Sequence, residues 1–264
     1  MKNAINPLSN IRIVLDHTSH PGNIGSAARA MKTMGITRLH LVAPQRFPHA
    51  DADALACDAR DLLENAQVSA TLDEALSGSV IAAGLTARRR DLQHPCLDVR
   101  EAARRLVEIA ATQQVALLFG NEAHGLSNAE LARCQYVISI PTDSAYTSLN
   151  VASAVQIMAY ELRMATLITP VTLEDTPPLA SLDDIEFFYQ RLEQTLTRIQ
   201  FLDPDHPKRL MPRIRRMFAR TQLEKEEFSI LKPAKSSGPR QALQQPLEPD
   251  SDTTPNPVAI TLQE

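Results

Sequence analysis

The chain has 264 residues, of which 44% are hydrophobic, which is enough apolar material for one large domain or for a domain with an appendage. Its formal net charge of −4 gives no general case for nucleic-acid binding. Its three cysteines lie too far apart for a disulfide framework or a zinc site, and we expect buried thiols in a reducing compartment: Cys57, Cys96 and Cys134. The first residues lack the apolar core of a signal peptide, and no apolar run reaches the ~18 residues of a membrane span. We therefore expect a cytoplasmic protein without a membrane segment.

Short apolar runs alternate with helical patterns over residues 1–168. The runs fall at residues 11–16, 38–44, 79–85, 115–120 and 136–141. Helical spacing falls between and after them, at residues 23–34, 51–66, 72–76, 99–111, 127–133 and 148–167. The runs are apolar throughout rather than at alternate positions, which is typical of parallel strands covered on both faces. This order predicts an α/β domain with a mostly parallel sheet between two layers of helices.

The composition changes after residue 168. Prolines and capping residues over 169–182 predict a linker, with a boundary near Pro178. Asp183 or Asp184 can cap a helix that runs to about Phe201, with one apolar stripe formed by Ile185, Phe188, Leu192, Leu196 and Ile199.

Two shorter helices, at residues 207–220 and 221–231, complete a predicted helical extension over 183–231. Three such helices form only a small core, so we expect the main domain or a second subunit to complete it. Residues 232–264 hold six prolines and no aromatic residue, and we expect them to be disordered.

One strongly basic segment stands out against the acidic average. Residues 206–220 read "HPKRLMPRIRRMFAR" and contain no acidic residue but six cations, Lys208, Arg209, Arg213, Arg215, Arg216 and Arg220. This local charge suits phosphate groups, although a solvated helix face has the same composition.

The first candidate site motif follows the first strand directly. In "HPGNIGSAARAMKTMG", Gly22 and Gly25 permit a tight turn, Asn23 can cap a helix, and Arg29 lies on the early turns of that helix. A strand, a glycine turn and a helix N-terminus bring backbone N–H groups toward a ligand. The segment is not a G-x-G-x-x-G fingerprint, and the chain contains neither a Walker-type G-K-[ST] nor a G-x-S-x-G elbow.

Two further motifs follow predicted strands. In "LLFGNEAHGLS" a strand ends at Gly120, the polar residues Glu122 and His124 follow, and Ser127 can cap the next helix. In "IPTDSAYTSLNVASAVQIMAYE" a strand enters a loop rich in hydroxyl and amide groups, where Ser148 or Asn150 can serve as an ordinary helix cap. The polar residues of that loop are Thr142, Asp143, Ser144, Thr147, Ser148 and Asn150.

Taken together and in this order, the three motifs resemble those of the SPOUT superfamily of RNA methyltransferases. The segments "TSHPGNIGSAARAMKTMG", "FGNEAHGLSNAELARCQY" and "YTSLNVASAVQIMAYELRMA" are similar to the TrmH-like branch and, within it, to bacterial tRNA (cytidine/uridine-2′-O)-methyltransferases of the J type. The likeness continues through the predicted extension and covers about residues 10–232. It implies a deep trefoil knot in the C-terminal part of the α/β domain, which no periodicity in the sequence indicates by itself.

The resemblance also implies a cofactor and a reaction, namely transfer of a methyl group from S-adenosylmethionine to a ribose 2′-hydroxyl. Cofactor contacts carry over to Leu85, Thr86, Ala87, Gly120, Ile140, Thr147, Ser148 and Leu149. Catalytic positions carry over to Arg29, Glu122, Ser148, Asn23 and Asn150. Arg29 suits phosphate binding and stabilisation of a developing alkoxide better than proton abstraction, because a guanidinium has a pKa above about 12. The general base is left unassigned.

For partners, the resemblance implies a homodimer that takes tRNA as substrate and methylates the pyrimidine at nucleotide 32 of the anticodon loop. RNA contacts are expected at Arg88, Arg89, Arg90, Lys208, Arg209, Arg213, Arg215, Arg216 and Arg220. No metal is implied. The segment "LTARRR" departs from the family's more usual Thr-Ser-Ala-Arg, and Ala123 stands where relatives often have a larger or basic residue, which leaves the substrate contacts open.

Three other functions compete with this one. A related 2′-O-methyltransferase of ribosomal RNA or of the tRNA wobble nucleotide shares the motifs, but such relatives typically lack the extension. A nicotinamide-dependent oxidoreductase suits the sheet, but the glycine fingerprint and the acidic residue after the second strand are missing. A non-catalytic RNA-binding dimer is opposed by the retention of Arg29, Glu122, Ser148 and Asn150.

Overall fold

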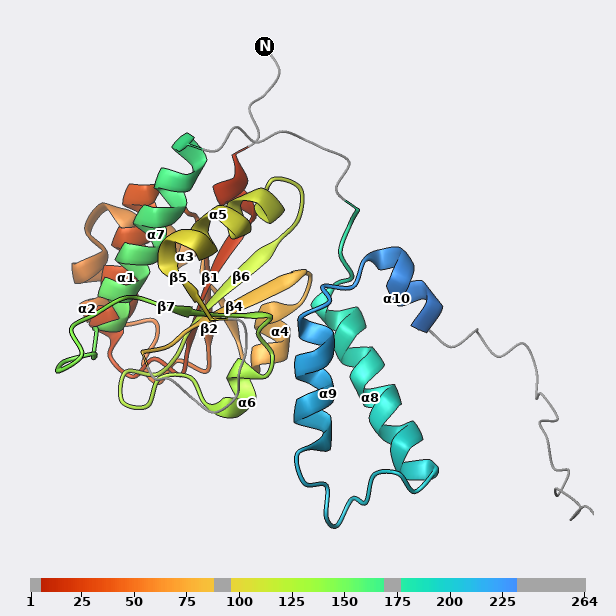
Figure 1. The fold of residues 1–264 in the computed structure, drawn as a ribbon. Coiled ribbons are helices and arrows are strands. Elements are labelled where there is room, and N and C mark those ends of the chain that lie inside the picture. The colour runs from red at the N-terminus through yellow and green to blue at the C-terminus, as the bar shows by residue number, and fades with distance from the viewer. Residues whose placement is uncertain (1–5, 88–95, 169–176, 232–264) are drawn as a thin grey trace, which may run out of the picture. The chain divides into compact units, whose positions relative to one another are not determined.

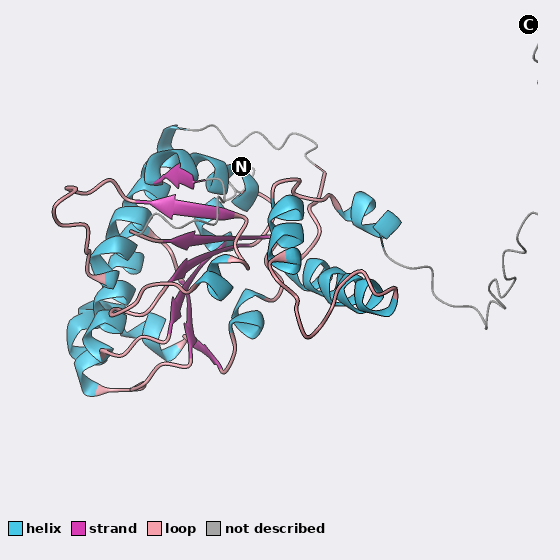
Figure 2. Cartoon of the chain, turned by 60° about the horizontal axis from the view of Figure 1, so that its bottom comes forward, coloured by secondary structure: helices cyan, strands magenta, loops and turns pink. Residues whose placement is uncertain are grey.

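The computed structural model describes residues 6–87, 96–168 and 177–231. Its centre is a seven-stranded sheet in the order β3-β2-β1-β6-β4-β7-β5, in which every neighbouring pair is parallel (Figures 1 and 2). The strands are β1 (Ile11–Asp16), β2 (Arg38–Val42), β3 (Gln67–Ser69), β4 (Ile81–Leu85), β5 (Cys96–Asp98), β6 (Val115–Phe119) and β7 (Tyr136–Ser139). The prediction of an α/β fold with a parallel sheet is confirmed.

Helices cover both faces of the sheet. The short segments are η1 (Pro7–Asn10), α2 (Ala50–Ala56), η2 (Cys57–Ala59), α3 (Arg60–Glu64), α4 (Leu72–Leu76) and α6 (Asn128–Leu131). The longer helices of the domain are α1 (Pro21–Met34), α5 (Val99–Ala110) and α7 (Val151–Ile168). Helices α1, α5 and α7 pack on one face over the larger apolar core, and α4 and α6 pack on the other face over a smaller core (Figure 1).

The central strands are buried on both faces, as their largely apolar sequences predict. All residues of β1, β4 and β6 are buried, and β1 pairs with β2 on one side and β6 on the other. This doubly covered position explains why the central strands lack an alternating pattern. The carboxyl ends of β1, β4, β6 and β7 meet at one edge of the sheet, where the three sequence motifs begin.

Two local caps fix the helices beside that edge. Helix α1 begins with Pro21 and ends at Gly35, whose φ of 81° is the left-handed conformation that glycine adopts without strain. Helix α6 begins with a capping box in which Ser127 accepts from the Glu130 N–H and the Glu130 carboxylate accepts from the Ser127 N–H. The predicted Ser127 cap is confirmed.

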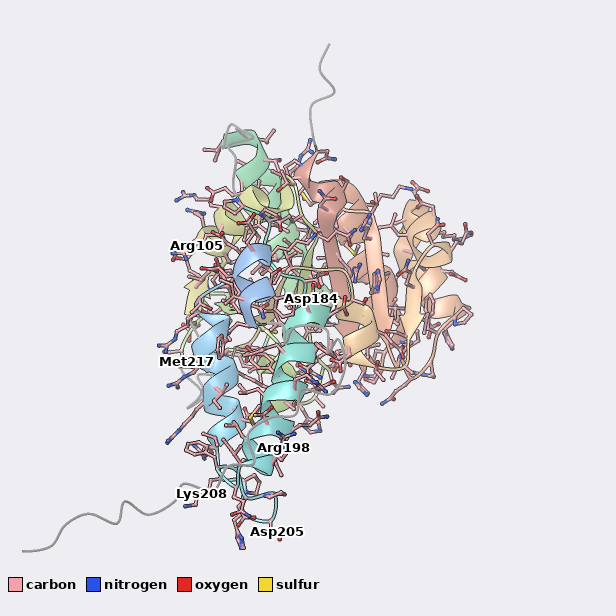
Figure 3. All side chains as sticks on the ribbon, turned by 90° about the vertical axis from the view of Figure 1, so that its right-hand side faces the viewer. Arg105, Asp184, Arg198, Asp205, Lys208 and Met217 are labelled. Carbon is pink, nitrogen blue, oxygen red and sulfur yellow. The ribbon has the colours of Figure 1, made fainter. Side chains whose placement is uncertain are left out.

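The extension consists of α8 (Leu182–Arg198), α9 (Leu210–Ala219) and α10 (Lys225–Leu231). Its small core holds Tyr189, Leu202 and Met211, with Phe188 and Phe218 in edge-to-face contact at 4.9 Å. Figure 3 shows Lys208 and Asp205 in the connection between α8 and α9. Three helices were predicted here, and three are found.

Several details differ from the predictions. The α8 cap is Ser181, which accepts from the Asp184 N–H, because a cap precedes the first turn that Asp183 and Asp184 occupy. The apolar stripe of α8 stops short of Ile199, which is 61% exposed. Cys134 is buried as expected, but Cys57 and Cys96 are exposed, since they lie at the end of α2 and on the edge strand β5.

The expectation that no segment spans a membrane stays a prediction, because one described helix passes a test of length and composition that core helices also pass. Helix α7 is long and apolar enough to cross a membrane by length and composition, and 39% of that window is buried inside the protein. Its buried residues join the main core with α1 and α5. The expected tail at 232–264 and most of the expected linker, residues 169–176, lie outside the described residues.

Candidate functional site

A cavity of about 510 Å³ lies at the carboxyl edge of the sheet, where open α/β sheets bind ligands. Its walls come from the segments that follow β4, β6 and β7 and from the start of α1. The lining residues are His20, Asn23, Leu85, Thr86, Ala87, Phe119, Gly120, Asn121, Glu122, Ala123, His124, Gly125, Ile138, Ile140, Thr142, Tyr146, Thr147, Ser148, Leu149, Asn150, Val151 and Ala154. All three motifs therefore contribute to one cavity.

The residues that carry the expected cofactor contacts all line this cavity. They are Leu85, Thr86 and Ala87 after β4, Gly120 after β6, Ile140 after β7, and Thr147, Ser148 and Leu149 before α7. The apolar members, together with Phe119 and Ile138, form a slot suited to a flat aromatic ring. Backbone groups of three adjacent loops surround that slot.

Gly120 allows two backbone segments in the wall of the cavity to approach each other closely. A Cβ atom at this position would lie 2.3 Å from the backbone carbon of Gly125, which is closer than real Cβ contacts. The Gly125 N–H donates to the Asn121 carbonyl at 2.7 Å and closes a tight turn over Gly120. No other residue type therefore fits at position 120 without displacing that turn.

Glu122 holds the start of α1 rather than projecting freely into the cavity. Its carboxylate accepts from the Ser19 N–H at 3.0 Å, the Ser19 hydroxyl at 2.9 Å, the His20 N–H at 3.2 Å and the Asn23 side-chain amide at 2.9 Å. Burial by itself raises the pKa of this carboxyl, but the hydrogen bonds from Asn23 and Ser19 outweigh it and lower the pKa to about 2. Glu122 is therefore a carboxylate near neutral pH and a weak proton acceptor.

Asn23 and Asn150 extend this network to the third motif. The Asn150 side-chain amide donates to the Asn23 side-chain oxygen at 2.8 Å. The Asn150 side-chain oxygen accepts from the Ala152 and Ser153 N–H groups and so caps α7, as one of the two predicted caps. Asn23 was expected to cap α1, but it lies inside the first turn and binds Glu122 instead, while His20 occupies the cap position.

The loop before α7 leaves one side of the cavity open. Every residue from 141 to 150 is exposed, including Ser148 and the large side chains of Tyr146 and Leu149, which are 76% and 39% exposed. Ser148 lines the cavity, as does Asn150 two residues later. A large molecule can therefore approach the cavity from this side.

Arg29 is the one expected catalytic residue that does not line the cavity. Its guanidinium lies 3.4 Å from the Cys57 thiol at the end of α2, and its side chain is exposed. Asn23 and Arg29 lie on different faces of α1, because the six residues that separate them correspond to about one and two-thirds turns of an α-helix. Within one chain, Arg29 therefore faces away from the Asn23 network.

The expected RNA-binding cations divide into two groups. Lys208, Arg209, Arg213 and Arg220 are exposed, whereas Arg215 and Arg216 are partly buried. Arg215 donates to both Glu186 carboxylate oxygens at 2.6 and 2.8 Å and lies 4.4 Å from the centre of the Tyr189 ring. Its guanidinium is thus engaged inside the extension. Arg88, Arg89 and Arg90 lie outside the described residues.

Sequence reasoning missed several lining residues. His20, Asn121 and Tyr146 line the cavity but were not selected, although each lies within three residues of a selected residue in its motif. Asn121 also donates to the His17 carbonyl at 2.7 Å, which ties the second motif to the end of β1. Contacts between residues about a hundred positions apart leave no pattern in the local sequence. Only membership of a motif could have indicated these lining residues.

Two family models match the chain. The model described as the SpoU rRNA Methylase family matches residues 10–160, and that of the tRNA methyltransferase TrmJ C-terminal domain matches residues 183–245. The chain is 48% identical over 236 residues to the tRNA (cytidine/uridine/adenosine-2′-O-)-methyltransferase TrmJ of Pseudomonas aeruginosa, covering 85% of this chain and 92% of that protein.

Solved structures agree with these matches. The crystal structure of TrmJ from Z. mobilis superposes with a TM-score of 0.75 at 28% identity, covering 83% of this chain and 95% of that chain. A structure described as giving insights into the 2-OH methylation of C/U34 on tRNA has a TM-score of 0.50 at 25% identity. It covers 61% of this chain and 99% of its own.

Proposed function

Since the chain belongs to the SpoU methylase family and carries a TrmJ C-terminal domain, we propose that it methylates the ribose of the pyrimidine at nucleotide 32 of the tRNA anticodon loop. The chain is an S-adenosylmethionine-dependent tRNA 2′-O-methyltransferase of this family. One observation carries the proposal. The three motif loops form a single cavity that combines an apolar slot with a polar wall at its open side.

The cavity fits S-adenosylmethionine. Leu85, Ile138, Ile140 and Leu149 offer an apolar slot for adenine, and the close approach at Gly120 lets backbone groups reach the ligand. When bound, the cofactor supplies an electrophilic methyl group on a sulfonium. The chain's residues must then orient the ribose, exclude water and help the hydroxyl to lose its proton.

We assign two kinds of role to the polar residues. Glu122, Asn23 and Asn150 hold the three loops in register, because their side chains bond to one another and to the starts of α1 and α7. Ser148 lies in the open wall and can bind the ribose hydroxyl. With its fixed positive charge, Arg29 would bind the adjacent phosphate and stabilise the developing alkoxide.

A homodimer would reconcile the position of Arg29 with this role. Within one chain Arg29 does not line the cavity, and the cavity is open beside exposed Tyr146 and Leu149. A second copy laid against this side would cover those apolar side chains and could supply its own Arg29 to the site. The site of each copy would then be completed by the other.

The extension supports the choice of nucleotide 32 over other RNA targets. The match to the neighbour associated with C/U34 spans 99% of that chain but only 61% of this one. That neighbour is therefore too short to match both the methyltransferase domain and the whole extension. In our proposal the extension, residues 183–231, follows the methyltransferase domain at 1–168 and a linker at 169–182. Its exposed cations Lys208, Arg209, Arg213 and Arg220 hold the tRNA backbone.

The remaining expectations belong to the same proposal. The family resemblance supports a deep trefoil knot in the C-terminal part of the domain, around the loops that follow β6 and β7. A tRNA substrate supports a cytoplasmic location with no membrane partner. The alternative of a non-catalytic RNA-binding dimer predicts that tRNA binds without turnover.

The test is transfer of labelled methyl from S-adenosylmethionine to a full-length tRNA pool, followed by mapping of the modified nucleotide. A 2′-O-methyl pyrimidine at nucleotide 32 is expected. Label at nucleotide 34 or only in ribosomal RNA would overturn the target, and tRNA binding without transfer would favour the non-catalytic dimer.

The role of Arg29 has its own test. Arg29→Ala should abolish transfer and leave cofactor affinity nearly unchanged, whereas turnover equal to the parent would contradict the role. Co-expressing Arg29→Ala with Ser148→Ala tests whether the arginine acts across the dimer. Random pairing would restore about a quarter of the sites if Arg29 serves its partner's site, and none if it serves its own.

A further inference from the structure

A second cluster of chemistry-bearing side chains lies outside the methyl-transfer cavity. Ligand atoms of Asp16, His17 and Glu130 all lie within 4.8 Å of one another, and none of these residues lines the cavity. Asp16 is the last residue of β1, His17 follows it, and Glu130 belongs to α6. We propose that these three side chains bind one divalent transition-metal ion, such as Zn²⁺ or Mn²⁺.

The buried carboxylate is the first reason for this assignment. The Asp16 side chain is only 3% exposed; its Oδ2 atom pairs with His17, whereas its Oδ1 atom has no hydrogen-bond partner within residues 6–87, 96–168 and 177–231. Burying a carboxylate oxygen without a partner is costly unless a cation or a donor compensates for it. The second carboxylate, Glu130, lies beside it, and two ionised carboxylates this close repel each other unless a cation lies between them.

The donor set indicates which ion would fit. His17 Nδ1 lies 3.0 Å from Asp16 Oδ2, a separation that suits two ligands of one metal ion with bonds of about 2.1 Å. An imidazole nitrogen with two carboxylate oxygens suits Zn²⁺ or Mn²⁺ rather than Ca²⁺ or Mg²⁺, which take oxygen ligands. The His17 side chain is 58% exposed, so the ion would have an entry path and room for a water ligand.

The position of the cluster indicates what the ion would do. Asp16 and His17 lead directly into the Ser19 and His20 segment that Glu122 holds, and the His17 carbonyl accepts from the Asn121 side chain. Glu130 lies just after the turn that closes over Gly120. A bound ion would therefore connect the segment after β1 to the segment after β6 on the side away from the cavity. It would be a structural site without contact to the reacting atoms.

The test is a titration of the tag-free full chain with ZnCl₂, followed by isothermal calorimetry. Because exposed thiols also bind Zn²⁺, the parent carries Cys57→Ser and Cys96→Ser. We expect one ion per chain and a melting temperature that rises with the free Zn²⁺ concentration. Replacing Zn²⁺ by Co²⁺ should give the visible absorption of a coordinated ion.

Two isosteric substitutions decide the ligands. Asp16→Asn and Glu130→Gln should each lower Zn²⁺ affinity at least about tenfold, and glutamine keeps the capping box of α6. Asp203→Asn is the matched control, because Asp203 lies 3.2 Å from His206 in an exposed pair that belongs to no such cluster among residues 6–87, 96–168 and 177–231. It should leave the affinity unchanged.

Two results would overturn the proposal. One is the lack of saturable binding by a parent protein that is folded, as judged by its melting temperature. The other is equal affinity in the parent and Asp16→Asn, which would place the bound ion elsewhere on the chain. Because binding is read directly, these outcomes do not depend on whether the chain methylates tRNA.

Discussion

Replacing Glu122 by glutamine tests whether this residue is a structural anchor. The folded protein lowers its pKa from 4.5 to about 2, and the full linkage would be about 3 kcal/mol for a buried carboxylate. Glu122 is half-buried, so solvent screening reduces this to about 1 to 2 kcal/mol. Glutamine keeps one acceptor oxygen but turns an NH₂ group toward donors. We therefore expect Glu122→Gln to lose about 1 to 2 kcal/mol of unfolding free energy at pH 7.

The pH dependence of this loss gives the sharper measurement. A carboxyl with a lowered pKa contributes stability above its unfolded pKa and loses it as pH falls through the folded pKa. The difference between parent and variant should therefore be largest at pH 7 and shrink between about pH 5 and pH 2. Urea unfolding of both proteins at several pH values measures it, with Glu101→Gln as a control for a solvent-accessible carboxylate that pairs with Arg105. A gap within about 0.5 kcal/mol at pH 7, or one independent of pH, would refute the anchor role.

Three further substitutions test other parts of the molecule. Gly120→Ala should abolish cofactor binding measured by calorimetry, because its Cβ would meet the Gly125 backbone at 2.3 Å. Arg215→Ala should lose about 2 kcal/mol in urea unfolding, whereas Arg213→Ala should keep stability and weaken tRNA binding in a filter assay. His40 is buried, and burial lowers its pKa to about 4. Stability should therefore fall from about pH 6.5 to pH 4, and less steeply in His40→Gln.

The main strands were predictable because their burial leaves a direct trace in the sequence. A strand covered on both faces takes apolar residues at most positions. Strands β4 and β6 are apolar throughout, and β1 departs from this only at Arg12 and Asp16. The short strands β3 and β5 escaped prediction because each has three residues and some of them are exposed. Strands of this length carry too few positions to show a period.

The location of the cavity was predictable from the sequence, but the hydrogen bonds that connect its walls were not. Each motif follows a strand, and parallel strands deliver their carboxyl ends to one edge, so a common cavity was expected. The four donors around Glu122 come from residues about a hundred positions away, and spacing along the chain carries no sign of them. Likewise, the charge pattern of 206–220 does not distinguish exposed Arg213 from Arg215, which binds Glu186.

The hydrogen-bond network around Glu122 reduces the number of groups that can take the proton from the ribose. Glu122 accepts four hydrogen bonds and has a pKa of about 2, so it has little tendency to accept a proton near neutral pH. The amides of Asn23 and Asn150 have no basic atom, and each is bound within the same network. Three of the five expected catalytic residues therefore belong to one hydrogen-bond network, and in our proposal Ser148 and Arg29 are the two that meet the substrate. Neither is a conventional base, so in our proposal the proton passes to the RNA phosphate, to water or to a lining residue outside the expected set, such as His20.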